Sequence, residues 1–403
     1  MNEKYQKKTK DSILNNKDVF DIDEANQIID AMQMHNYNCD YDKTIELYGK
    51  YKSVFSNDAF FSNKLLSEYE LATHKIILDS KPRNIMVILT NICDIRCIMC
   101  HQDRTPLKNI DKKIVDIVLS NLQYTEKLIW QGGEVLTLPY FKDILVKTIN
   151  YPRIRYTVIS NFQNISDEII ELISKNNIDF IISIDSIIKE KYEKIRIGAS
   201  FDRLEKNIKK LNDCMSKSES KVYLQINFVI MPMNYKEIPD IIDFAHRYNF
   251  STVAFLRCIT DNESLKITKE YEKDVMEYIK LAKEKADKYN IRIINTFAEF
   301  NNNDCKNDTI KDYIVNSQNE NKGLFCHLPW YGLLILEDNT VKPHSACGYT
   351  SFVNIDSYNN INDIWNNEVM QNYRKQMLKH EYGSCIRECR LMLSHETRKK
   401  FNK

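Results

Sequence analysis

Residues 90–100 read Thr90-Asn91-Ile92-Cys93-Asp94-Ile95-Arg96-Cys97-Ile98-Met99-Cys100, directly after an apolar run at 85–89 that predicts a β-strand. Three thiolates within eight residues can ligate one face of an iron–sulfur cluster, for which cysteine is the usual ligand. A structural zinc site generally needs four protein ligands. Zinc would therefore require a further ligand such as His101, and a chance grouping among the chain's 11 cysteines is the other alternative. The spacing and the strand-end position favour a cluster with one iron left open.

Short β-rich runs alternate with longer amphipathic stretches on the carboxyl side of this segment. The predicted strands are 85–89, 128–131, 154–159, 180–184, 222–229 and 252–256, and the predicted helices between them are 113–122, 167–175, 202–215 and 237–247. Most strands are followed by a helix, which predicts a parallel sheet with right-handed crossovers. Six such units are fewer than the eight of a closed barrel. We therefore expect an α/β fold, a partial (β/α)6 TIM-like barrel with its chemistry at the carboxyl ends of the strands.

Changes of pattern along the chain predict its domain organisation. Helical periodicity fills residues 23–35, 41–55 and 62–77, while a charged helix at 266–289 and a strand at 291–295 precede an Asn/Asp-rich stretch at 301–321. The predicted divisions are a helical N-terminal region at 1–80, the partial barrel at 81–260, a helix, strand and linker at 261–321, a small metal-cluster domain at 322–395 and a basic tail at 396–403.

Bulk composition narrows the possible partners and the compartment. The 57 basic and 56 acidic side chains give a net charge of +1, so the chain lacks the one-signed field of a nucleic-acid binder. The sequence has no apolar run long enough to span a bilayer and no signal peptide, which predicts a cytoplasmic protein without membrane contact. Cysteines grouped in a reducing compartment are more often metal ligands or catalytic thiols than disulfides.

The CxxxCxxC triplet at Cys93, Cys97 and Cys100 resembles the signature of the radical SAM superfamily. The resemblance implies that these cysteines ligate a 4Fe-4S cluster whose fourth iron is chelated by S-adenosyl-L-methionine. It also implies reductive cleavage to a 5′-deoxyadenosyl radical that abstracts hydrogen from a substrate. Met99 stands where the family often has an aromatic residue, and we expect this adaptable apolar side chain to pack at the adenine side.

Further strand-end residues resemble the cofactor-binding positions of that family. Gly132-Gly133-Glu134 is similar to the GGEP element with Val135 in place of proline, and glycine is otherwise scarce, at 8 of 403 residues. A plain β-turn is the alternative for this element. The implied cofactor-binding residues are Met99, Gly132, Gly133, Glu134, Ser160, Asn161, Ser183, Asp185, Arg196, Gln225 and Asn227. Arg196 could equally be a surface helix residue, and Gln225 and Asn227 could be a structural polar pair.

A second cysteine group stands near the C-terminus and consists of Cys326, Cys347, Cys385 and Cys389. This part resembles the Twitch domain, the shortened form of the SPASM extension, which implies a second, auxiliary 4Fe-4S cluster. Asn339 replaces the usual hairpin glycine, and asparagine tolerates the left-handed backbone of such a turn. His344 is the rival of Cys347 as a ligand, and a purely structural zinc ion is the alternative metal.

The resemblance favours oxidation or cross-linking of a peptide or protein side chain, with an external one-electron donor such as flavodoxin or ferredoxin. A dehydrogenase or epimerase of a small alcohol or sugar is the alternative. A non-catalytic iron–sulfur or zinc module is the alternative of another class. Cys258 follows the sixth predicted strand, so it is a candidate catalytic thiol or hydrogen donor, although a packing role is the simpler interpretation.

Overall fold

The computed structural model describes residues 20–100, 102, 105–176, 178–218, 222–296, 325–345, 347 and 353–381. They divide into two compact units. The first unit lies within Met1–Met86, Asp111–Lys127 and Asn307–Lys403, and the second within Val87–Ile110 and Leu128–Lys306. No described helix combines the length and the apolar character needed to cross a membrane.

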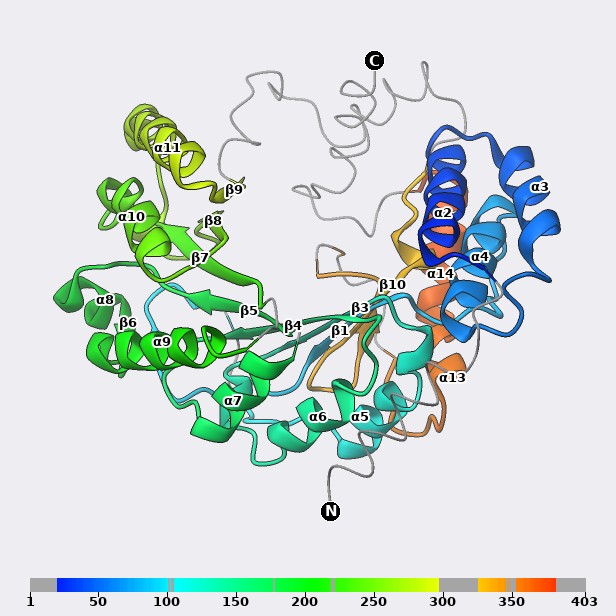
Figure 1. The fold of residues 1–403 in the computed structure, drawn as a ribbon, viewed down its shortest axis with the longest axis horizontal. Coiled ribbons are helices and arrows are strands. Elements are labelled where there is room, and N and C mark those ends of the chain that lie inside the picture. Colours follow the sequence, from blue (N-terminus) through cyan, green and yellow to red (C-terminus); the bar gives the residue numbers. More distant parts are fainter. Residues whose placement is uncertain are drawn as a thin grey trace. The chain divides into compact units, whose positions relative to one another are not determined.

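A curved, largely parallel sheet organises the second unit (Figure 1). Seven of its nine strands follow the order β1-β3-β4-β5-β7-β8-β9, and the first residues of β1 belong to the first unit. The bounds are β1 Asn84–Ile88, β3 Lys127–Gln131, β4 Arg155–Ser160, β5 Ile178–Ser183, β7 Leu224–Ile230, β8 Thr252–Arg257 and β9 Arg292–Asn295. Each neighbouring pair from β4 to β9 is parallel. The predicted α/β partial barrel is therefore confirmed.

Beyond β8 the sheet continues by one strand that the sequence pattern placed outside the six-stranded barrel. β9 pairs in parallel with β8, in a register that runs from Thr252↔Arg292 to Phe255↔Asn295. The 21-residue helix α11 (Lys269–Tyr289) supplies the crossover between these strands. Four residues with weak alternation cannot reveal their partner, so the pattern placed this strand outside the barrel.

Helices cover the outer face of this sheet, as Figure 1 shows. They are α6 Phe141–Thr148, α7 Asp167–Lys175, α8 Lys189–Ile195, α9 Phe201–Met215, α10 Asp240–Arg247 and α11. Successive strand residues point to opposite faces. On β5 and β7, Ile182 and Phe228 are fully buried, whereas Ser183 and Asn227 on the opposite face are half-buried. The inner face therefore stays accessible at the carboxyl ends of the strands.

A second, two-stranded sheet lies within the same unit and has no counterpart in the predicted elements. β2 (Arg96–Cys97) pairs antiparallel with β6 (Arg196–Ile197), and Cys97 is the register partner of Arg196. The second cysteine of the triplet is thereby fixed to the segment that follows α8.

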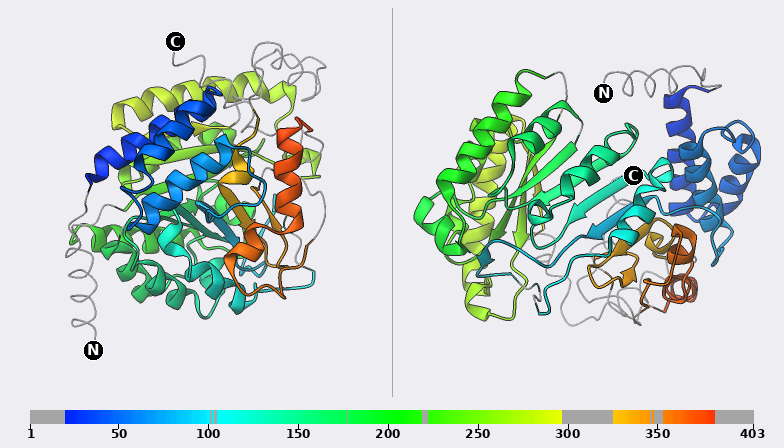
Figure 2. Two further views of the ribbon diagram at one scale, coloured as in Figure 1. Left: turned by 90° about the vertical axis from the view of Figure 1, so that its right-hand side faces the viewer. Right: turned by 90° about the horizontal axis from the view of Figure 1, so that it is seen from below.

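The first unit combines segments from both ends of the chain. Figure 2 shows α2, α3 and α4 (blue) packed against one another. The bounds in this unit are α2 Ile22–Tyr37, α3 Tyr41–Tyr51, α4 Ala59–Ala72, α5 Lys112–Leu119, β10 Gly332–Ile335, β11 Val341–Lys342, α13 Ile361–Trp365 and α14 Glu368–Leu378. β10 and β11 form an antiparallel hairpin, with Leu334 opposite Lys342.

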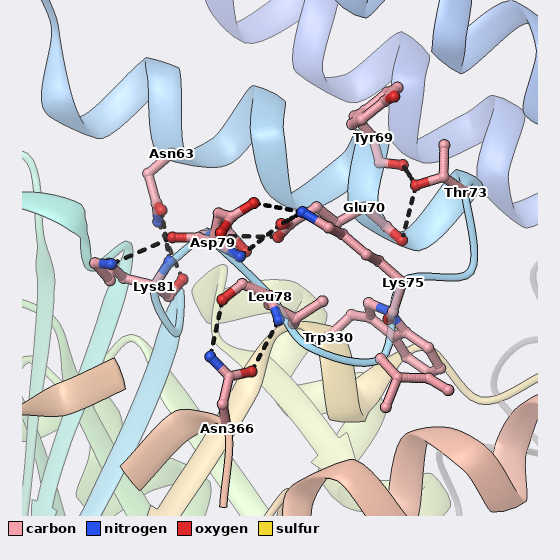
Figure 3. A network of polar contacts seen from close by, with 12 residues as sticks. Asn63, Tyr69, Glu70, Thr73, Lys75, Leu78, Asp79, Lys81, Trp330 and Asn366 are labelled. Carbon is pink, nitrogen blue, oxygen red and sulfur yellow. Dashed lines mark hydrogen bonds and ion pairs between the residues drawn. The ribbon is translucent and has the colours of Figure 1, made fainter. Parts of the chain in front are cut away.

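Polar contacts around residues 73–81 join these segments (Figure 3). The buried carboxylate of Glu70 accepts hydrogen bonds from the backbone N–H of Asp79 at 2.6 Å and from Lys75 Nζ at 3.1 Å. Asn366 accepts from the N–H of Leu78 and donates to its carbonyl, both at 2.8 Å. The indole N–H of Trp330 donates to the carbonyl of Lys75 at 2.8 Å. The C-terminal segment thus satisfies backbone groups of the segment that follows α4.

Candidate active site

The cysteine triplet lies on the loop that leaves β1 in the second unit. Cys93 and Cys97 are half-buried thiols and Cys100 is an exposed one. The N–H of Cys100 donates to the carbonyl of Cys97 at 3.2 Å, and the N–H of Ile98 donates to that of Ile195 at 3.0 Å. Among the residues that the structure describes, no three His, Cys, Asp or Glu side chains converge as the ligands of a single metal ion would. His101, the rival zinc ligand, lies outside the described residues.

The double glycine packs directly against the backbone of this loop. The N–H of Gly133 donates to the carbonyl of Thr90 at 2.6 Å, and that of Glu134 donates to the carbonyl of Ile92 at 2.8 Å. A Cβ at Gly132 would lie 2.5 Å from the carbonyl oxygen of Thr90, and one at Gly133 would overlap the carbonyl of Ile92. The glycines therefore permit close approach of two chain segments, and their predicted contact with a ligand stays a prediction.

Glu134 joins the glycine turn to the end of β4. Its buried carboxylate accepts hydrogen bonds from Ser160 Oγ at 2.8 Å, from the N–H of Asn161 at 2.6 Å and from that of Leu136 at 3.1 Å. Burial raises the pKa of Glu134 to about 7, although these hydrogen bonds favour the charged form. The carboxylate and the Ser160 hydroxyl thus already have protein partners, and their predicted contact with S-adenosylmethionine stays a prediction.

Asp94, which sequence reasoning missed, anchors the cysteine loop to β4. Its Oδ1 accepts a hydrogen bond from Asn161 Nδ2 at 2.8 Å, and its Oδ2 accepts one from Asn164 Nδ2 at 2.5 Å. The thiol of Cys93 lies 3.8 Å from the same Oδ1. Residues on both sides of Cys93 are therefore held: the turn at Gly133 and Glu134 bonds to Thr90 and Ile92, and Asn161, which bonds to Glu134, also bonds to Asp94. The sequence signal that could have identified Asp94 is its position between Cys93 and Cys97, where an acidic side chain lies next to a predicted ligand.

Arg196 is buried beside the second cysteine, so its interpretation as a surface helix residue is wrong. It is 6% exposed, and its Nη1 lies 3.6 Å from Cys97 Sγ. Its Nη2 forms an ion pair with Asp185 Oδ2 at 2.6 Å. Burial raises the pKa of the Cys97 thiol to about 11, and the nearby guanidinium opposes this rise. The predicted residues Asp185, Arg196 and Cys97 thus form one contact chain.

Met99 and Cys258 belong to one apolar cluster. Met99 is 8% exposed and Cys258 is 5% exposed, and they share the cluster with Ile195, Met231 and Leu265. Burial raises the pKa of Cys258, which disfavours the thiolate. These surroundings are those of a packing thiol, and a catalytic role for Cys258 stays a prediction.

The remaining predicted cofactor residues lie on β5 and β7. Ser183 and Asn227 are register partners, so they lie side by side on the inner face. Gln225 Nε2 donates to Asn227 Oδ1 at 2.9 Å. The Nδ2 group of Asn227 is not used in this bond and can donate to another acceptor. The two amides therefore form a polar pair, as one alternative held, and their predicted contact with the cofactor stays a prediction.

The second cysteine group is only partly described. In the first unit Cys326 is buried and Cys347 is half-buried, while Cys385 and Cys389 lie outside the described residues. Asn339 adopts φ +63° in the β10–β11 turn, which confirms the expected left-handed backbone. Lys342 Nζ donates to the carbonyl of Cys347 at 3.0 Å. Burial lowers the pKa of His344, which favours the neutral imidazole that can ligate a metal.

The chain is similar to known proteins in its sequence and in its fold. The family model described as "Radical SAM superfamily" matches residues 87–245. The chain is similar to a probable GTP 3′,8-cyclase of Methanocaldococcus jannaschii, with 25% identity over 170 residues that cover 40% of this chain and 54% of the relative. The GTP 3′,8-cyclase of Clostridium botulinum strain Hall is 25% identical over 210 residues, covering 48% of this chain and 63% of the relative. The match spans only about half to three-fifths of these relatives' length.

Solved structures share the fold. Streptococcus suis SuiB bound to S-adenosylmethionine superimposes with a TM-score of 0.57 at 17% identity, covering 83% of this chain and 78% of SuiB. The protein anSMEcpe with bound AdoMet gives a TM-score of 0.52 at 15% identity, covering 75% of this chain and 81% of that protein. At such identities the likeness establishes the architecture alone.

Proposed function

We propose that this chain, whose residues 87–245 match the radical SAM superfamily, is an enzyme that reductively cleaves S-adenosylmethionine and abstracts a hydrogen atom from a bound substrate. The cysteine loop carries the proposal. Its three thiols follow β1, and its backbone is held by Gly133 and Glu134 as described above. A metal module without a ligand site needs no half-buried polar residues on the inner face of its sheet, which argues against the non-catalytic alternative.

Each part of the site has a proposed task. Cys93, Cys97 and Cys100 would hold the 4Fe-4S cluster, which together with bound S-adenosylmethionine supplies the 5′-deoxyadenosyl radical. Met99, a member of the apolar cluster that includes Cys258, would pack against the adenine. Asn227 and Ser183 would offer an amide N–H and a hydroxyl to oxygen atoms of a ligand. Arg196 Nε, which is buried without a hydrogen-bond partner, is directed to the carboxylate of the methionine moiety in this proposal.

Formation of 5′-deoxyadenosine by the anaerobically reconstituted protein with a reductant tests this proposal. We expect turnover in the wild type and none after Cys93, Cys97 and Cys100 are replaced together by alanine. Cys214→Ala is the matched control, because Cys214 is a half-buried thiol on α9, outside the site. Activity that survives in the triple variant would refute the mechanism.

We propose a peptide or protein side chain as the substrate, oxidised or cross-linked with loss of two hydrogens. One hydrogen atom passes to the 5′-deoxyadenosyl radical, and the second leaves as a proton to solvent and an electron that the auxiliary cluster would accept. Solved SuiB was captured with the precursor peptide SuiA, and anSMEcpe with the Cp18Cys peptide. The inner-face residues Ser183, Gln225 and Asn227 are uncharged and suit amide and hydroxyl groups. A small alcohol or sugar would use the same donors, and it remains the alternative. Flavodoxin or ferredoxin would supply electrons, and a cytoplasmic location remains a prediction.

Cyclisation of a nucleotide is a second candidate, because the matched sequence relatives are named GTP 3′,8-cyclases. A triphosphate is strongly anionic and calls for arginine or lysine contacts. Arg196, beside Cys97, is paired with Asp185, and Arg96, within the cysteine loop, donates to the carbonyls of Cys93 and Ile95. We therefore expect added GTP to remain unconverted, whereas a pool of unstructured peptides raises 5′-deoxyadenosine formation and yields products two hydrogens lighter. Conversion of GTP to a cyclised product would reverse this choice.

A further inference from the structure

Arg196 reaches the cysteine loop through the two-stranded pair of β2 and β6. Register places Arg196 directly opposite Cys97, and the guanidinium Nη1 lies 3.6 Å from Cys97 Sγ. That distance lies within hydrogen-bond range for a sulfur acceptor. Because a thiolate bound to iron has no proton, the N–H group is the donor of this contact once the cluster is present. The bond is charge-assisted, which makes it stronger than a neutral one.

Asp185 fixes the guanidinium in this position. The ion pair of Arg196 Nη2 with Asp185 Oδ2 spans 2.6 Å, and the Asp185 side chain is 0% exposed. Oδ1 of Asp185 accepts a hydrogen bond from the N–H of Val229 at 2.8 Å, and its carbonyl accepts one from Asn234 Nδ2 at 2.7 Å. Because Asp185 already holds Nη2, the guanidinium loses little further freedom when Nη1 donates to sulfur. The N–H donor is therefore preorganised beside the ligand.

A charge of the opposite sign stands beside the first cysteine. Asp94 Oδ1 lies 3.8 Å from Cys93 Sγ, and amides of Asn161 and Asn164 hold this carboxylate in place. One ligand of the predicted cluster thus has a fixed cation as its neighbour, and another has a fixed anion.

We propose that Arg196, held by Asp185, is a positioning residue that raises the reduction potential of the cluster on Cys93, Cys97 and Cys100, and that Asp94 lowers it. This inference rests on the proposed function, because it needs the cluster to form. Reduction adds one negative charge to the cluster. A cationic N–H donor at a ligand sulfur stabilises that charge, and a neighbouring carboxylate destabilises it, as hydrogen bonds and net charge do in iron–sulfur proteins.

A redox titration of the reconstituted full chain, followed by the electron paramagnetic resonance of the reduced cluster without S-adenosylmethionine, tests the inference. The variants are Arg196→Gln, Arg196→Lys and Asp94→Asn. Iron content and a thermal melt of each variant report whether cluster and fold persist. The auxiliary site is removed in all proteins by Cys326→Ser and Cys347→Ser, so that one signal is read.

We expect Arg196→Gln to lower the midpoint potential. At one fixed applied potential, the ratio of reduced to oxidised cluster should fall at least tenfold, which corresponds to about 59 mV for one electron. Arg196→Lys keeps the charge but lacks the planar fork, so its potential should fall between those of the wild type and the glutamine variant. Asp94→Asn keeps the size of the side chain and should raise the potential.

An Arg196→Gln potential equal to or above that of the wild type would overturn the inference, as would an Asp94→Asn potential below it. If the glutamine variant retains no iron, a lysine variant with the wild-type potential is the overturning result. A wild-type protein that builds no cluster would overturn the proposed function together with this inference. A cluster with the expected shifts that fails to cleave S-adenosylmethionine would overturn the proposed function alone.

Discussion

The backbone N–H of Asn161 lies 2.6 Å from the carboxylate Oε2 of Glu134, so the end of β4 is bonded to the turn after β3 through a buried acid. The same turn donates to the carbonyls of Thr90 and Ile92 just before Cys93. The position of the first cysteine therefore depends on a carboxylate that is itself costly to ionise.

Glu134 should make stability depend on pH. Burial raises its folded pKa from 4.5 to about 7. Between these values the unfolded chain loses the proton while the folded chain keeps it, so the unfolding free energy falls as pH rises and levels off above about 7. The contribution is about 3 kcal/mol. Denaturant unfolding of the cluster-free protein and of Glu134→Gln from about pH 4.5 to 8 measures it. As pH rises across this range, the unfolding free energy of Glu134→Gln should increase relative to that of the wild type by that amount. The exposed Glu168→Gln serves as control, and a constant difference between Glu134→Gln and wild type would contradict the prediction.

Alanine at Gly133 should destabilise the second unit, because the added Cβ would overlap the carbonyl of Ile92 and force the cysteine loop away. Overpacking of this kind costs on the order of 1–3 kcal/mol. The loop shift should also reduce iron retained after reconstitution. Gly49→Ala is the matched control. Gly49 lies in α3, where an added Cβ would meet nothing within 4 Å, so alanine there should stabilise by up to about 1 kcal/mol. Equal urea midpoints for the two variants would be incompatible with this account.

The central strands and longer helices could be predicted from the sequence because their signals are local. Buried parallel strands are continuous apolar runs, and the predicted helix at 167–175 coincides with α7, whose N-cap is Ser166. The short helices α6 and α8 were not among the predicted helices, although the equally short α5 and α10 were, so about two turns of periodicity gave an uneven signal.

The contacts that shape the site were beyond prediction because they join distant residues. Asp94 meets Asn161, which is 67 positions away, and Cys97 meets Arg196 through two-residue strands that carry no pattern of their own. For the same reason the sequence could not show that the first unit combines both ends of the chain, since Trp330 bonds to Lys75 across 255 positions. The residue types at the site were predictable from chemistry, whereas their mutual contacts were not.

Arg374 should be essential for the stability of the first unit. Its fully buried guanidinium donates to the carbonyls of Ile76, Pro329 and Trp365, each at 2.9 Å. Arg374→Ala would leave three buried acceptors without a donor, at about 1–3 kcal/mol each. We expect a loss of several kcal/mol by denaturant unfolding, with Arg374→Lys in between. The adjacent, exposed Lys375→Ala should change little. An Arg374→Ala variant as stable as Lys375→Ala would show that water replaces the guanidinium.

Iron content should separate the two predicted metal sites. Two four-iron clusters predict about eight irons per chain in the reconstituted wild type. Cys326→Ser with Cys347→Ser should reduce this to about four while the radical SAM cluster remains, because these two cysteines belong to the first unit and the triplet to the second. The alanine triple variant at Cys93, Cys97 and Cys100 should also retain about four irons. Inductively coupled plasma mass spectrometry measures iron and zinc together. About four irons and one zinc in the wild type would refute the auxiliary cluster and establish structural zinc, without bearing on the cluster of the triplet.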